Sequence, residues 1–185
     1  MTARRIAATL RLVHLADLLV AVAVFGVVSA GMLTVLQESL RVYMVGAARA
    51  ESQQSARVAV ERLAAEIRTA GLGPHPEIPA ISIAEPSRIV LHHDLDGDGI
   101  IGAGETITWR LAGTTLRRDA GGGAQPVIDG VRTFALAYLD ASDRATASAD
   151  EARSVVITLA TEAAWDLADR SVVTTYTTRV RLRNR

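Results

Sequence analysis

Residues 18–36 read LLVAVAVFGVVSAGMLTVL, nineteen consecutive residues without a charged side chain. At a helical rise of about 1.5 Å per residue, this run covers roughly 28 Å, close to the ~30 Å hydrocarbon core of a bilayer. Arg4, Arg5 and Arg11 precede the run, and Asp17 is the first acidic residue of the chain. Because arginine beside a span favours the cytoplasmic side, we expect one membrane span with a cytoplasmic N-terminus.

A cleaved secretory signal peptide is the alternative interpretation of this run. The apolar region of such a peptide is about 7–15 residues long and ends at a cleavage site of small residues. The run found here is longer, and a helical pattern follows it without a break. We therefore expect the segment to be retained as a membrane anchor.

The helical pattern continues well beyond the uncharged run. Apolar residues at spacings of three and four mark one face of a helix: Leu40, Tyr43, Met44 and Ala47, and later Val60, Leu63, Ala64 and Ile67. Arg62 and Glu66 stand four residues apart, and we expect them to pair on the outer face. Gly71-Leu72-Gly73-Pro74 then supplies a C-cap glycine and a helix breaker, so the helix is predicted to end near Gly71.

After Pro79 the apolar period changes from about 3.6 to about 2, which is typical of strands. The predicted strands cover 80–84, 88–93, 106–111, 114–118, 131–140, 154–161 and 172–182, with a hairpin turn at Ala112-Gly113 and a loop at 121–123. One long helix followed by a series of strands predicts an α+β fold. In this fold the N-terminal helix packs on a C-terminal antiparallel β-sheet domain.

The composition disfavours several classes of function. From residue 37 on, 17 arginines stand against 19 acidic residues, so no nucleic-acid partner is expected. Cysteine is absent, so an exported domain must fold without disulfides. No Ser-His-Asp or Cys-His arrangement and no phosphate-binding loop is visible, so we do not expect an enzyme. His92 and His93 are adjacent and would face opposite sides of a strand, which disfavours a joint metal site.

Residues 94–105, DLDGDGIIGAGE, match the twelve-residue calcium loop D-x-D-x-D-G-x5-E. In such a loop the carboxylates of Asp94, Asp96 and Asp98, the carbonyl of Ile100 and a bidentate Glu105 would hold the ion. The flanks predict strands, in contrast to the helices of an EF-hand. A plain turn that binds nothing is the alternative, because Asp and Gly are ordinary turn residues. All constrained positions are filled, which is more than a turn requires, so we favour calcium.

The residues around the start of the apolar run are similar to a known family. Leu15-Ala16-Asp17-Leu18-Leu19-Val20-Ala21 resembles the start of type IV pilins and type II secretion pseudopilins, whose pattern is Gly followed by Phe-Thr-Leu-Ile-Glu-Leu-Leu-Val-Ala. The resemblance puts Asp17 at the family's glutamate, which pairs with a neighbouring subunit's N-terminal amine during assembly. It puts Leu12 at the glycine where prepilin peptidase cuts, and Val13 at the methylated phenylalanine. A solvated interfacial residue is the alternative role for Asp17.

Three later segments resemble PilW-like minor pilins and, more loosely, GspJ-type pseudopilins. They are the helix end 60–71 (VERLAAEIRTAG), the hairpin segments 105–111 (ETITWRL) and 115–118 (TLRR), and the closing strand at 180–184 (VRLRN). Their order along the chain carries the likeness, which spans nearly the whole sequence. It implies a basic leader at 1–12, a transmembrane half-helix at 13–36, an exported half-helix at 37–71 and a β-rich domain at 72–185.

Two functions from different classes fit these features. The first is a structural subunit, a minor pilin or pseudopilin whose helix contacts the membrane and other pilins in a type IV pilus or a type II secretion-like filament. The second is a membrane-anchored periplasmic calcium-binding domain that does not polymerise. The two differ at Leu12, because processing there by prepilin peptidase belongs to the first function alone.

Overall fold

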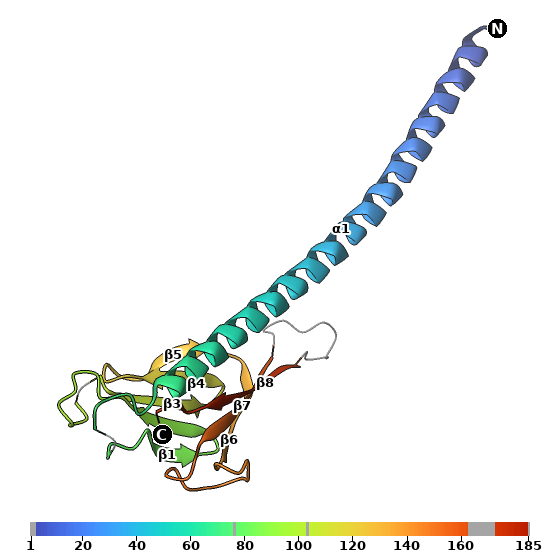
Figure 1. Ribbon diagram of the computed structural model, residues 1–185. Coiled ribbons are helices and arrows are strands. Elements are labelled where there is room, and N and C mark those ends of the chain that lie inside the picture. The colour runs from blue at the N-terminus through green and yellow to red at the C-terminus, as the bar shows by residue number, and fades with distance from the viewer. Residues whose placement is uncertain (1–2, 76, 103, 163–172, 185) are drawn as a thin grey trace. The chain divides into compact units, whose positions relative to one another are not determined.

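The computed structural model describes residues 3–75, 77–102, 104–162 and 173–184, with the backbone alone for 3–14. One helix, α1 (Ala3–Thr69), precedes eight strands in the described chain (Figure 1). The chain divides into two compact units, Met1–Gly46 and Ala47–Arg185, and each is described by itself below. The one long N-terminal helix and the antiparallel sheets confirm the predicted α+β fold.

The first unit is the N-terminal part of α1, and its apolar side chains are exposed from Leu15 on. Phe25, Val27 and Met32 are exposed by 74%, 74% and 76%. By length and composition this helix can cross a membrane, and none of its most apolar 18-residue window is buried in the described chain. So much exposed apolar surface is costly in water, so it needs a lipid or protein environment. The prediction of a helix that can span a bilayer is confirmed.

The helix ends two residues before the predicted glycine. Gly71 has a φ of +73°, a left-handed conformation that terminates helices. A Cβ at this position would lie 2.9 Å from the Cβ of Ala80, so only glycine lets the two segments approach. The Gly71 N–H donates to the carbonyl of His92 at 2.8 Å. The C-terminal end of α1 is therefore joined directly to the second strand.

Sheet A is a five-stranded antiparallel sheet whose strands follow the order of the chain. They are β1 (Ile81–Glu85), β2 (Arg88–His92), β3 (Thr106–Ala112), β4 (Thr115–Asp119) and β5 (Gln125–Ile128). The strand β5 was not predicted, because it is short, contains Pro126 and follows a glycine run. Proline is compatible with an edge strand, which is the place of β5.

The predicted hairpin turn between β3 and β4 was wrong by one residue. Ala112 pairs with Thr115, so the turn consists of Gly113 and Thr114, not Ala112 and Gly113. Gly113 has a φ of +63°, as the first central residue of a tight hairpin turn requires. The glycine thus fixes the position of the turn, and Ala112 is still part of β3.

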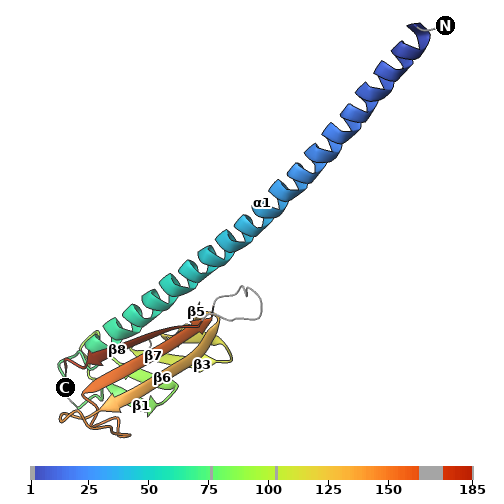
Figure 2. The same cartoon turned by 90° about the vertical axis from the view of Figure 1, so that its right-hand side faces the viewer.

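Sheet B is a three-stranded antiparallel sheet in the order β6-β7-β8 (Figure 2). Its strands are β6 (Val131–Leu139), β7 (Ser154–Glu162) and β8 (Val173–Arg181). The predicted strands agree with these bounds to within a residue, except that Val172 lies outside the described residues. Trp165 lies outside them too.

The core of the second unit joins both sheets to the C-terminal part of α1. Alanines make up much of the buried helix face, and their small size lets the sheets lie close to the helix. Leu63 and Ile67 from this face are almost completely buried, by 99% and 100%. They belong to one apolar cluster with residues of both sheets, including Ile89, Trp109, Leu136, Ile157 and Leu159. The core is aliphatic with few aromatic residues, as the composition requires.

The expected position of Glu66 on the outer face of α1 was wrong. Its side chain is only 14% exposed, and Arg118 donates from Nε to Oε1 at 2.8 Å. Trp109 donates from Nε1 to Oε2 at 2.5 Å. The predicted partner Arg62 is farther, with Nε 3.5 Å from Oε1. The strand partners draw the carboxylate inward because a buried indole N–H and a half-buried guanidinium both require an acceptor.

Candidate functional site

The predicted calcium loop follows β2 and leads into β3, and backbone hydrogen bonds fix both of its ends. The His93 N–H donates to the Glu105 carbonyl at 2.9 Å, which closes the base of the loop. The Asp94 N–H donates to the Leu72 carbonyl at 2.8 Å. The first aspartate of the loop is therefore held against the segment that leaves α1.

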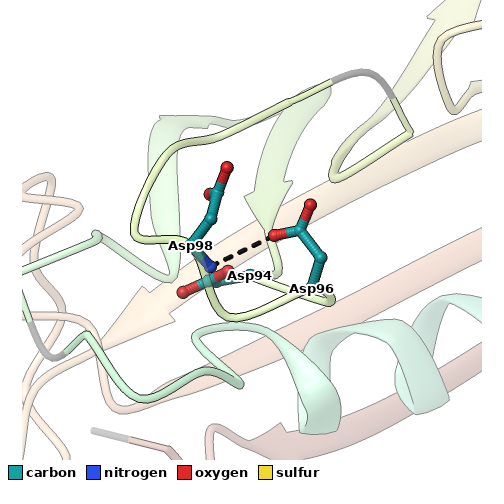
Figure 3. Close-up of side chains that lie close together, drawn as sticks. All are labelled: Asp94, Asp96 and Asp98. Atoms are coloured by element: carbon teal, nitrogen blue, oxygen red, sulfur yellow. Dashed lines mark hydrogen bonds between the residues drawn. The ribbon is translucent and has the colours of Figure 1, made fainter.

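The structure brings together three of the predicted ligands. One carboxylate oxygen from each of Asp94, Asp96 and Asp98 lies within 4.8 Å of the other two. Figure 3 shows the three side chains around a tight turn of the loop, with the Asp98 N–H donating to Oδ1 of Asp96 at 3.2 Å. Asp94 is 4% exposed, whereas Asp96 and Asp98 are more open to solvent. This arrangement concentrates the negative charge of three carboxylates in a small volume.

One oxygen of this cluster is buried and unused. Oδ1 of Asp94 accepts from the Gly97 N–H at 2.8 Å, but Oδ2 has no hydrogen-bond partner among the described residues. A Cβ at Gly73 would lie 2.5 Å from the Cβ of Asp94 and 3.0 Å from its Oδ2. Only glycine at this position lets the chain cover the carboxylate so closely. A buried carboxylate oxygen without a donor is costly, and a cation would satisfy it.

Glu105 is not part of the aspartate cluster in this structure. Its Oε1 accepts from the N–H groups of Leu95 at 2.6 Å and Asp96 at 3.4 Å, and its Oε2 accepts from Gly102 at 2.7 Å. These backbone donors, with Gly102 first, hold the pKa of Glu105 below its usual value. Glu105 therefore orders the loop from inside, a role that the motif alone does not predict.

The motif predicts that the carbonyl of Ile100 is a ligand, and among the described residues the structure shows only its backbone N–H in a hydrogen bond within the loop. Its N–H donates to Oδ1 of Asp98 at 2.7 Å, and its side chain is 68% exposed. The exposed side chain is not part of the apolar core. The described hydrogen bonds do not assign a ligand role to its carbonyl.

The donor set fits a hard divalent cation. Calcium prefers several oxygen ligands, and carboxylates from alternating loop positions can supply them. Asp94, Asp96 and Asp98 would hold the ion, with the unpaired Oδ2 of Asp94 as the buried donor. Bound there, the ion would offset two of the three negative charges and hold Asp94 beside the segment that leaves α1.

The two adjacent histidines of β2 and the following loop point to different partners. The ring of His92 lies 2.8 Å from the Ser82 hydroxyl and 3.1 Å from the Thr106 hydroxyl. His93 is 5% exposed, and its Nε2 lies 3.0 Å from Oγ1 of Thr69 at the end of α1. Burial lowers the pKa of both rings, and the neighbouring His93 lowers that of His92 further. His92 therefore links neighbouring strands, and the buried His93 contacts the end of α1.

The second predicted site lies at the N-terminal part of α1. Asp17 is exposed on the helix, directly before the uncharged run. Leu12 and Val13 have helical backbone, and their side chains lie outside the described residues. A carboxylate at the end of an apolar helix is costly in lipid unless it is paired or reaches the interface. At this end of the uncharged run, the Asp17 carboxylate therefore needs a partner or solvent.

No protein-family model matches this chain, and no curated protein is similar to it. The similarity to pilins therefore rests on the residues quoted above, and what it implies about function is a proposal.

Proposed function

We propose that this protein is a structural subunit of a type IV pilus or of a type II secretion-like filament, a minor pilin or pseudopilin. The observation that carries the proposal is the two-part character of α1. Most of its large apolar side chains between Leu15 and Met44 are exposed, whereas from Ala56 on one face lies in the core of an α+β domain. A filament subunit needs such a helix, because its N-terminal part packs against the helices of other subunits and its C-terminal part belongs to the core of the folded domain.

Before assembly, the apolar part of α1 anchors the protein in the bacterial inner membrane. The arginines at positions 4, 5 and 11 favour a cytoplasmic N-terminus, which puts the domain in the periplasm. Prepilin peptidase would cut after Leu12 and leave Val13 as the new N-terminus. Leucine stands at position 12, where the pilin pattern has glycine.

In the filament, Asp17 pairs with the N-terminal amine of a neighbouring subunit. The pairing explains why a carboxylate stands at the edge of an uncharged run of nineteen residues. In the apolar surroundings of packed helices an unpaired charge is costly, so a missing or misaligned neighbour would be disfavoured. The charge would thus set the register of the subunits.

We assign calcium as the cation of the aspartate cluster, with Asp94, Asp96 and Asp98 as the carboxylate ligands. The support is the full match to the twelve-residue motif and the unpaired buried Oδ2 of Asp94. The same observation favours the second candidate function, a membrane-anchored periplasmic calcium-binding domain that never polymerises. The two functions differ only in whether the protein leaves the membrane with other pilins.

Replacing Asp17 tests the filament function. Asp17→Ala should leave the protein inserted and folded, because the apolar run is intact, and should reduce its share in sheared filaments. Asp17→Glu restores the carboxylate and should recover incorporation. Glu38→Ala, a charge removed from the same helix beyond the uncharged run, serves as the matched control.

The mass of the protein recovered from filaments shows whether the chain begins at Val13. Equal recovery of wild type and Asp17→Ala in filaments would contradict the role of the carboxylate. Wild-type protein that stays in the inner membrane and never co-purifies with other pilins would support the non-polymerising domain.

A further inference from the structure

The strand register of sheet A aligns three arginines side by side. Arg88 of β2 is paired with Arg110 of β3, and Arg110 is paired with Arg117 of β4. Residues that are paired across strands project from the same face, and neighbouring strands lie about 4.8 Å apart. The three residues, named the arginine row here, therefore start from backbone positions within about 10 Å.

The arginine row lies on the face of sheet A that points away from the core. Trp109 and Leu116 are almost completely buried and alternate with Arg110 and Arg117 along their strands. Because successive residues of a strand point to opposite faces, the row faces outward. Arg110 is exposed, and Arg88 and Arg117 are partly buried. The row is thus accessible from solvent on the described domain.

Within the described chain no carboxylate forms an ion pair with the row. Six other arginines do form such pairs with carboxylates of the described residues: Arg57, Arg62, Arg118, Arg132, Arg144 and Arg179. Among the described residues, Arg117 donates to the carbonyl of Ala124, at 3.1 Å. Nε of Arg88 is buried and has no acceptor among the described residues. Like charges directly opposite each other destabilise a sheet, so the row costs stability that an external anion would offset.

We propose that the arginine row binds a carboxylate-bearing segment of a partner protein. Carboxylates match guanidinium groups in shape and charge. Acidic residues spaced four apart on a helix present their side chains about 5–6 Å from each other, close to the spacing of the strands. The proposal does not depend on the filament function, because an anchored domain can use the same face.

The charges around the row favour discrete carboxylates over a polyanion. Glu85 is paired with Arg88 at one end of the row, and Asp119 is paired with Thr108 on the same face. From residue 37 on, the chain carries 19 acidic residues against 17 arginines. A nucleic-acid backbone extends its charge beyond three contacts and would be repelled by these carboxylates. A short acidic segment can contact the row alone.

Fluorescence anisotropy with the full chain in non-ionic detergent tests the proposal. The probe is a labelled alanine-based helical peptide with glutamate at every fourth position, and its glutamine counterpart is the uncharged control. We expect the glutamate peptide alone to bind at low ionic strength and to dissociate at high salt. Arg110→Gln combined with Arg117→Gln should weaken binding about tenfold.

Matched variants distinguish specific binding by the arginine row from a general effect of positive charge. Arg49→Gln with Arg183→Gln removes the same charge from exposed positions outside the row and should change affinity less than twofold. Arg110→Lys should retain most of the affinity, and Arg110→Glu should abolish it. Circular dichroism checks that each variant is folded.

Three outcomes would overturn the proposal. They are no binding of the glutamate peptide, equal loss in the row variant and the matched control, or tighter binding of an oligodeoxythymidine than of the glutamate peptide. The last outcome would make nucleic acid the ligand of this face.

Discussion

At the scale of single residues, Asp94 is the most informative side chain of the loop. It is 4% exposed, it lies under Gly73, and its Oδ2 is unpaired in the described structure. An ordinary Asp-Gly turn needs only one carboxylate oxygen to accept a backbone N–H, as Oδ1 of Asp94 does. The buried second oxygen is what separates a cation site from a polar turn.

Calcium should therefore stabilise the folded protein. A ligand that binds only the folded state adds about 2.7 kcal/mol at a hundredfold excess over its Kd. The full chain in non-ionic detergent should melt at higher temperature in millimolar calcium than in chelator. Magnesium should replace calcium poorly, because it prefers a smaller octahedral shell.

The double variant Asp94→Ala with Asp98→Ala should remove this difference between calcium and chelator. Glu51→Ala with Glu61→Ala removes two acidic residues from the exposed surface of α1 and should keep it. Identical melting curves for the wild type in calcium and chelator, with no heat on calorimetric titration, would reduce the loop to a polar turn.

The lowered pKa of Glu105 predicts that the stability of the protein depends on pH even without a bound ion. Backbone donors hold the pKa of Glu105 below its usual value in the folded protein. A carboxylate with a lowered folded pKa stabilises the protein above its usual pKa of about 4.3, and this contribution is lost as pH falls through the folded value. In chelator, the unfolding free energy of Glu105→Gln should fall less than that of the wild type as the pH is lowered from 5, as urea unfolding at each pH would measure.

Other carboxylates also titrate in this range, so the slope should be reduced and not abolished. The pKa of Asp140 is lowered too, chiefly by the backbone N–H of Arg144. An unchanged acid slope in Glu105→Gln would mean that the loop hydrogen bonds contribute no stability.

At the scale of elements, Glu66 connects α1 to sheet A. Its carboxylate accepts from Trp109 of β3 and Arg118 of β4, so one helix residue joins two strands. Glu66→Ala should leave the Trp109 N–H and the Arg118 guanidinium without their acceptor and cost about 3 kcal/mol of unfolding free energy. Urea unfolding in detergent measures this change.

Glu61 on the same helix is the matched control for Glu66. It pairs with Arg57 at 2.9 Å, and both side chains are more than 60% exposed, at 63% and 67%. Glu61→Ala should change the unfolding free energy by no more than about 0.5 kcal/mol. Equal effects of the two substitutions would show that the buried contacts of Glu66 add nothing to helix packing.

The fold was largely predictable because its signals are local. The period of apolar residues marks α1 and seven of the eight strands, and Gly71 marks the end of the helix. The missed strand β5 is too short to give a clear local signal, and two other missed features depend on pairing between distant segments. The inward position of Glu66 needs Trp109 and Arg118, and the arginine row needs the register of three strands.

The candidate metal site was predictable in part for the same reason. The motif places Asp94, Asp96 and Asp98 within five residues, so a single turn brings their carboxylates together. The sequence alone does not show that Gly73 covers Asp94 or that Glu105 binds backbone N–H groups. Both depend on the segment that leaves α1 and on the base of the loop.

At the scale of the whole molecule, the two units need different surroundings. The exposed apolar side chains of the first unit are stable in lipid or against other apolar helices, whereas the second unit has its own core. The lack of cysteine means that this core holds without disulfides in any compartment. Membrane orientation then decides which side of the membrane carries the aspartate loop and the arginine row.

The orientation is predicted by Arg4, Arg5 and Arg11, which precede the apolar run with no acidic residue before Asp17. A reporter enzyme that is active only outside the cytoplasm, fused after Arg185, should therefore be active. Replacing Arg4, Arg5 and Arg11 by glutamine and introducing Gln37→Arg with Glu38→Arg moves the positive charge to the other end of the run. This variant should lose most of the reporter activity, because cytoplasmic arginine sets the direction of insertion. A wild-type fusion that is active only as a cytoplasmic reporter would contradict both proposed functions, since each requires the domain outside the cytoplasm.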